Sequence, residues 1–210
     1  MRKLIIILGI FLLTGAGIYW YYSAKIAGMN REAEEGTAIT ARLPERIRHF
    51  LRKSEFDDDN LTWSDFMEKE VSPSTGGVQA TRFQRPLVFT DFITANIQLP
   101  TDGIYQVSLN KALGFDAWQD GSGVDGLILE HYNGKTDGYY VNTITDRKTG
   151  DAYRMYCSYT YLRLADTTVV YRDTVWGPKA PERTDNSNGA TGGLVKEIDK
   201  VAAIRRMTGR

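Results

Sequence analysis

An uncharged apolar segment near the N-terminus is the feature that most constrains this chain. Residues 4–22, LIIILGIFLLTGAGIYWYY, are 19 residues without a charged side chain. A helix needs about 20 mostly apolar residues to cross a bilayer core of about 30 Å. The apolar core of a secretory signal peptide is shorter, at about 7–15 residues. The segment is therefore expected to be a retained transmembrane anchor that contacts membrane lipid.

A cleavable signal peptide is the alternative interpretation of this segment. The small residues Thr14–Ala16 follow ten apolar residues and offer a site to a signal peptidase. Against cleavage, the aromatic run Tyr19–Tyr22 comes next and is typical of a belt in the headgroup layer. Arg2 and Lys3 precede the segment and favour a cytoplasmic N-terminus. The expected topology is a single pass with a periplasmic or extracellular C-terminal domain.

The overall charge balance and the cysteine content narrow the class of protein. Lys and Arg number 26, and Asp and Glu also number 26, so the chain has no net charge. Nucleic-acid-binding surfaces normally show a basic excess, so no nucleic-acid partner is expected. Cys157 is the single cysteine and allows no intramolecular disulfide. Secreted eukaryotic domains of this size are commonly cross-linked, which favours a bacterial inner-membrane location.

Composition and turn signals divide the chain into four parts. We expect an anchor at 1–22, a stalk at 23–43, a short helical segment with a linker at 44–77, and a sheet with a C-terminal helix at 78–210. Gly36 is expected to end any outward extension of the membrane helix, because glycine disfavours helix interiors.

Two short helices are expected in the third part. Pro44 suits a first helical turn, and Ile47 and Phe50 fall on one face of a helix over 44–54. The arginines of this helix leave open an alternative in which it lies on the lipid surface. A second short helix fits residues 62–71.

The apolar period changes to two from residue 86, which predicts strands. The expected strands cover residues 86–99, 103–109, 125–132, 137–145, 151–164 and 166–176. The last four are separated by short turn sequences such as Asn133-Gly134 and Asp137-Gly138, so they should form an antiparallel meander. Leu194, Ile198, Val201 and Ile204 predict an amphipathic C-terminal helix that covers the sheet.

These elements predict an α+β fold. It would consist of an N-terminal transmembrane helix, two short helices, and an antiparallel β-meander, curved or half-barrel, with a C-terminal capping helix. A closed seven-stranded barrel capped by that helix is the architectural alternative.

Familiar catalytic and metal-binding patterns find little support. The simplest hairpin registers place His131 and Cys157 on opposite faces of the sheet, which argues against a thiol–imidazole dyad. Two histidines and one cysteine cannot supply a four-ligand zinc site. Asp116, Asp120 and Asp125 lack the alternating spacing of a calcium loop. No metal or cofactor is expected, and catalysis is disfavoured.

Tyrosine is abundant on three of the expected strands, and an exposed tyrosine-rich face would suit a binding surface. The candidate ligand- or partner-binding residues are Trp118, Asp120, Glu130, His131, Tyr140 and Tyr156. The leading hypothesis is a membrane-anchored envelope binding or assembly module without catalytic activity, whose partner is another envelope protein. The alternatives are an envelope glycan or peptide hydrolase using acidic residues, and an immunity or inhibitor protein.

Overall fold

The computed structural model describes residues 2–52, 83–90, 103–141, 147–181 and 189–209, and side chains in the first of these ranges are described from Thr14 onward. This part of the chain is α+β, with four α-helices and a mixed, open sheet. The expected helix at 62–71, the linker that follows it and the expected strand residues 91–99 lie outside the described residues.

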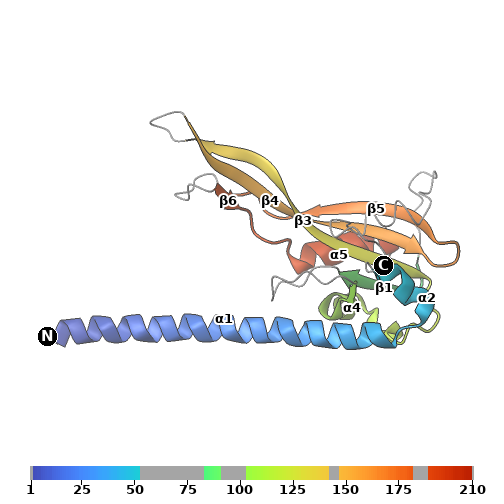
Figure 1. The fold of residues 1–210 in the computed structure, drawn as a ribbon, viewed down its shortest axis with the longest axis horizontal. Helices are drawn as coiled ribbons and strands as arrows, with labels where there is room; N and C mark the ends of the chain where they lie inside the picture. The colour runs from blue at the N-terminus through green and yellow to red at the C-terminus, as the bar shows by residue number, and fades with distance from the viewer. Residues whose placement is uncertain (1, 53–82, 91–102, 142–146, 182–188, 210) are drawn as a thin grey trace.

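The N-terminal helix α1 runs without interruption from Arg2 to Arg42 and is about 60 Å long at about 1.5 Å per residue. Figure 1 shows its N-terminal half projecting away from the rest of the fold. The expectation that Gly36 ends the helix is wrong: Gly36 is buried inside it. Among the residues whose side chains are described, no helix combines the length and apolarity needed to span a membrane. Residues 4–13 of the expected anchor lie outside that part.

The C-terminal part of α1 packs against strand β2 (Ile104–Tyr105) and helix α4 (Val107–Leu113). The Glu32 carboxylate accepts a hydrogen bond from the Ser108 amide in the first turn of α4, at 2.8 Å. The Thr40 hydroxyl accepts one from the Tyr105 amide at 2.9 Å. The expected strand over 103–109 is therefore only two residues long, because α4 begins at Val107 and finds its N-terminal partner on α1.

Helix α2 (Glu45–Arg48) and the 3₁₀ turn η1 (His49–Leu51) follow directly. Ile47, Phe50 and Leu51 are buried there, as the expected apolar face requires. α1 continues for 20 residues beyond Tyr22, or about 30 Å, before it ends at Arg42, and α2 begins after that end. This distance argues against the alternative in which the basic helix lies on the same lipid surface as the tyrosine belt.

The sheet has the strand order β2–β1–β3–β4–β5, and β6 pairs with β4 beyond this path. Its further strands are β1 (Pro86–Thr90), β3 (Gly126–Val141), β4 (Lys148–Arg163), β5 (Thr168–Trp176) and β6 (Gly189–Thr191). The β1–β3 and β4–β6 pairs are parallel, and the others are antiparallel. The expected antiparallel meander thus accounts for most of the sheet, but the sheet is mixed and it does not close into a barrel.

One long strand replaces a hairpin that the turn sequences predict. Asn133-Gly134 and Asp137-Gly138 lie inside β3, which pairs with β4 along its whole length. Gly138 has a positive φ of 121°, and the register shifts between Thr136 and Tyr139, so this turn sequence forms a bulge. The described residues between 125 and 176 therefore form three strands, β3, β4 and β5, where four were expected.

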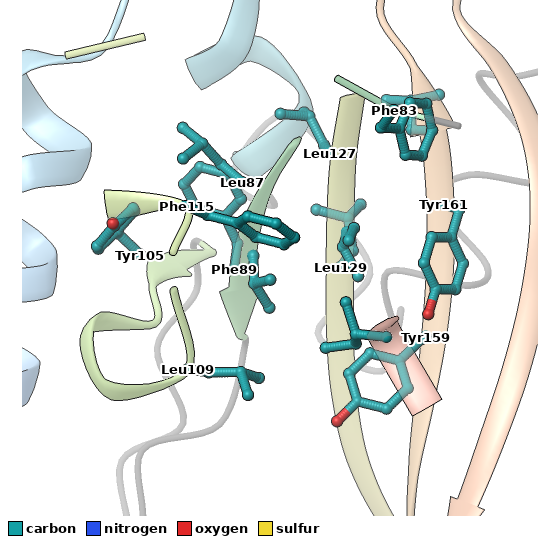
Figure 2. Close-up of a cluster of buried hydrophobic side chains, with 14 of the residues drawn as sticks. Phe83, Leu87, Phe89, Tyr105, Leu109, Phe115, Leu127, Leu129, Tyr159 and Tyr161 are labelled. Atoms are coloured by element: carbon teal, nitrogen blue, oxygen red, sulfur yellow. The ribbon is translucent and has the colours of Figure 1, made fainter. Parts of the chain in front are cut away.

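The core lies on both faces of the sheet. Leu87 and Phe89 of β1 share one face with Leu127 and Leu129 of β3, and Figure 2 shows Phe115 beside the β1 pair. All five side chains are at most 1% exposed. Tyr159 and Tyr161 are buried on the opposite face, where Figure 2 places them on β4.

Helix α5 (Glu197–Thr208) covers the face that carries Tyr159. Ile204 and Met207 of α5 are buried, whereas Ile198 is 73% exposed and Leu194, before the helix, is 56% exposed. The expected apolar face is therefore right at Ile204 and at Val201, which packs against the core, and wrong at Leu194 and Ile198. Leu194 precedes the helix, and Ile198 lies six residues before Ile204 and therefore about 120° away from it around the helix axis.

Candidate functional site

A buried polar cluster lies between the sheet and α5. Glu130 on β3 is 2% exposed, and its carboxylate accepts hydrogen bonds from the Lys200 ammonium at 2.7 Å and from the Tyr159 hydroxyl at 2.8 Å. The Lys200 ammonium also lies 5.4 Å from the centre of the Tyr132 ring. The Tyr132 hydroxyl in turn accepts the Val195 amide at 2.9 Å. These contacts connect β3 and β4 to the segment that leads into α5.

The surroundings of this cluster raise the pKa values of Lys200, Tyr159 and Cys157, so all three groups keep their protons at neutral pH. Burial is the largest single influence on Lys200 and opposes its charge, but the charge and hydrogen bond of Glu130, together with Cys157 and Tyr132, outweigh burial, so the pKa of Lys200 is raised. Burial, with the Glu130 charge, raises the pKa of the Tyr159 hydroxyl well above its usual value. Burial likewise raises the pKa of the Cys157 thiol to about 12. A thiol with this pKa is a poor nucleophile at neutral pH, so Cys157 acts as a packed side chain.

His131 and Cys157 lie on opposite faces of the sheet. His131 pairs with Ser158, and Cys157 pairs with Tyr132 on the next position. The expected separation of these two side chains is confirmed, although the strand register differs from the hairpins used to predict it. Because side chains alternate along a strand, the two residues cannot form a dyad across the sheet.

An aromatic and basic surface lies on the face of β4 and β5 opposite α5. The Tyr156 and Trp176 rings pack with their centres 4.9 Å apart, and the Arg154 guanidinium lies 5.2 Å from the centre of the Trp176 ring. Arg154 also donates to the Gly177 carbonyl at 2.8 Å, which holds it in place. Trp176 is 41% exposed. We call Arg154, Tyr156 and Trp176 the aromatic surface.

An arm built on β3 and β4 extends beyond the body of the sheet. It consists of residues 133–141 of β3 and 148–156 of β4, past the last β1 partner at Glu130. Figure 1 shows this arm projecting from the body to the same side as the N-terminal half of α1. β6 pairs with it at Asp151–Tyr153.

The remaining predicted site residues have separate surroundings. Trp118 is half-buried, and its ring packs 6.2 Å from that of Phe115. Asp120 is exposed, and its carboxylate accepts the Ser122 amide at 2.9 Å within the same loop. Tyr140 is buried on the arm and donates to the Pro181 carbonyl at 2.6 Å.

The structure therefore divides the six predicted residues among different environments. Asn133, which pairs with Tyr156, is two positions from His131 along β3, so His131 and Tyr156 share one face of the sheet. Glu130 belongs to the buried cluster on the other face, and Trp118, Asp120 and Tyr140 have the separate surroundings described above.

Two features of this region were missed in the sequence. Trp176 completes the aromatic surface. It is the direct cross-strand partner of Tyr156, so the β4–β5 register would have indicated it. An open hollow of about 360 Å³ between η1 and the β4–β5 turn is lined by none of the predicted residues. Its lining is Glu45, Arg46, His49, Phe50, Leu164 and Thr167.

Within the described ranges, no group of three or more His, Cys, Asp or Glu side chains is arranged to hold a metal ion. The sequence matches no protein-family model, and no curated protein or solved structure is significantly similar to it.

Proposed function

We propose that this protein is a membrane-anchored binding or assembly module that presents its aromatic surface to another envelope protein. The observation that carries the proposal is the exposed aromatic run on α1. Ile18, Tyr19, Trp20, Tyr21 and Tyr22 are 54–77% exposed. Ten residues further along α1, Glu32 ties the helix to the body through its hydrogen bond with the Ser108 amide. Removing apolar and aromatic surface from water is favourable, so a bilayer and its headgroup layer are the natural environment of this run.

The aromatic surface supports the binding part of the proposal. Tyr, Trp and Arg are the residue types most enriched at the energetic centres of protein interfaces. Here Arg154, Tyr156 and Trp176 are held in place by each other and by the sheet. A rigid surface of this kind loses little conformational entropy when a partner binds.

The anchor is tested by placing charges in the apolar segment of the full chain. Ile10→Arg with Leu13→Arg should move the protein out of the membrane fraction, because each arginine costs about 2.5–3.5 kcal/mol at the centre of a spanning helix. Ile26→Arg is the matched control, since it lies on the same helix beyond the tyrosines and is already 47% exposed. The measurement is the fraction retained by membranes after alkaline carbonate extraction. Wild-type protein in the supernatant, or a mature chain that starts at Gly17, would contradict the anchor.

The partner surface is tested by photo-crosslinking in intact membranes. A photoreactive residue at Thr174, exposed on the same face as Trp176, should form one discrete protein adduct. The same residue at the exposed Lys111 on α4 should not form it. Adding Trp176→Ala to the Thr174 probe should remove most of the adduct, because the aromatic side chain supplies the contact area. Adduct formation unaffected by Trp176→Ala would show that the aromatic surface is not the binding surface.

A further inference from the structure

The end of the arm carries aromatic and basic side chains far from the body of the protein. Tyr139 is 64% exposed, Val141 39% and Tyr153 38%. Arg147 and Lys148 are exposed beside them. Aromatic rings together with basic groups are the side-chain types that favour the headgroup layer of a membrane. We call these five residues the arm end.

The arm end is long enough to reach the membrane level set by α1. Gly36 packs against Tyr105, and Tyr105, Phe89 and Leu129 are consecutive ladder partners, so they lie at one level of the fold. From Gly36 back to Tyr22 is 14 residues of helix, or about 21 Å.

The length of β3 toward the arm end is measured from Leu129, which lies at the same level. From Leu129 to Val141 is 12 residues of strand, or about 40 Å. Figure 1 shows both segments projecting from the body to the same side. If the arm axis is inclined to the axis of α1 by less than about 58°, the arm end therefore reaches the level of Tyr22.

The charge of the arm suits an anionic surface. Residues 133–156 include four basic side chains, Lys135, Arg147, Lys148 and Arg154, and three acidic ones, Asp137, Asp146 and Asp151, which leaves a net charge of +1. Lys148 forms an exposed ion pair with Asp151 at 2.6 Å. Anionic lipid headgroups attract a local excess of basic side chains near the bilayer surface.

We propose that the arm end binds anionic phospholipid headgroups on the same bilayer surface that the tyrosine belt of α1 contacts, an inference that rests on the proposed membrane anchor. A single helix would leave the body free to turn about the helix axis. A second contact at the arm end stops that rotation. The aromatic surface is then held in a constant direction relative to the membrane, which suits an assembly module.

The test uses the full chain in vesicles of phosphatidylcholine and phosphatidylglycerol, with a fluorophore on an introduced cysteine. Cys157 can stay, because it is fully buried and its pKa is raised to about 12 by that burial, so it reacts slowly. The labelled variants are Tyr21→Cys on α1, Tyr139→Cys at the arm end, and Ala165→Cys in the exposed turn at the opposite end of β4. The readout is quenching by lipids that carry a nitroxide on the headgroup.

Strong quenching at Tyr21→Cys and Tyr139→Cys, with little at Ala165→Cys, is the expected result. Quenching at Tyr21→Cys without quenching at Tyr139→Cys would overturn the arm contact and leave the anchor intact. Equal quenching at all three positions would overturn it too, because the whole body would then lie on the surface. Absence of quenching at Tyr21→Cys would overturn the anchor itself, and the arm contact with it.

A charge-reversed arm separates headgroup binding from simple proximity. Arg147→Glu with Lys148→Glu should weaken the arm contact about fivefold or more for each basic side chain replaced, and only in vesicles that contain phosphatidylglycerol. Quenching at Tyr21→Cys should not change, since the anchor is untouched. If the charge-reversed variant is quenched at Tyr139→Cys as strongly as the unreversed one, the arm end does not bind anionic headgroups.

Discussion

Replacing Lys200 with methionine should lower the free energy of unfolding by about 3–5 kcal/mol, because the Glu130 carboxylate would remain buried without its cation. Glu130 is 2% exposed, and only 14% of the Lys200 side chain is accessible. The Tyr159 hydroxyl would still donate to Glu130, but a neutral donor cannot compensate a full charge. Chemical denaturation of the detergent-solubilised full chain, followed by tryptophan fluorescence, measures this change.

Two further variants test whether the lost stability comes from the buried charge of Glu130. Lys148→Met removes the same kind of ion pair from the exposed arm, with Asp151 at 2.6 Å, and should leave stability unchanged because exposed pairs contribute little. Lys200→Met combined with Glu130→Gln should recover much of the loss, since no charge is then buried. A Lys200→Met protein as stable as wild type would mean that water reaches the Glu130 carboxylate and that the cluster does not hold α5.

The single cysteine gives a second readout of the same prediction. Cys157 is fully buried on the face of the sheet that α5 covers. Reaction with a thiol reagent at neutral pH therefore requires α5 to open. If Lys200→Met lowers the opening free energy by the expected amount, the labelling rate should rise about 150- to 5,000-fold. An unchanged rate alongside reduced stability would place the damage elsewhere in the fold.

The pH dependence of stability has a definite sign. Burial opposes the charge of Lys200, but Glu130, Cys157 and Tyr132 together outweigh burial and raise the pKa of Lys200. The pKa of Tyr159 is raised chiefly by burial. A group whose pKa is higher in the folded protein stabilises it fully below its unfolded value and loses that contribution as the pH rises through the folded value. The cluster should therefore weaken on the alkaline side, above about pH 10.

A methyl group added at Gly36 should release α1 from the body. Gly36 is buried where the helix crosses β2, and a Cβ there would collide with the Tyr105 carbonyl and lie 2.9 Å from the Ile104 side chain. The obstacle is backbone, which cannot rotate aside. Gly36→Ala should therefore cost about 1–3 kcal/mol despite its better helix propensity. The displacement would also break the Thr40–Tyr105 hydrogen bond.

Gly28→Ala is the matched control for this prediction. It makes the same substitution on the same helix, where nothing lies within 4 Å of the added atom. It should leave the body unaffected and strengthen the helix by up to about 1 kcal/mol. Hydrogen–deuterium exchange of residues 32–42, with thermal unfolding, measures both variants. Equal exchange in Gly36→Ala and Gly28→Ala would contradict the close packing of α1 on β2.

The turn sequences of the sheet illustrate where sequence reasoning succeeds and where it fails. Asn133-Gly134 and Asp137-Gly138 indicate backbone that tolerates a positive φ, and Gly138 has one. Whether such a residue closes a hairpin or forms a bulge depends on the strand opposite. Here the 16 residues of β4 supply a continuous partner for β3, and the ladder is kept.

What the amino-acid sequence determined by itself is local: the α+β class, the period-two strands, the apolar face of α2 and η1, and the apolar N-terminal segment. These follow from side-chain spacing and backbone preference, which act over a few residues. The tertiary structure alone decided the parallel pairing of β1 with β3, the helix through Gly36, and the burial of Glu130 beneath Lys200. Each of these depends on a contact between residues distant in the chain, and such a contact cannot be predicted from the spacing of neighbouring residues.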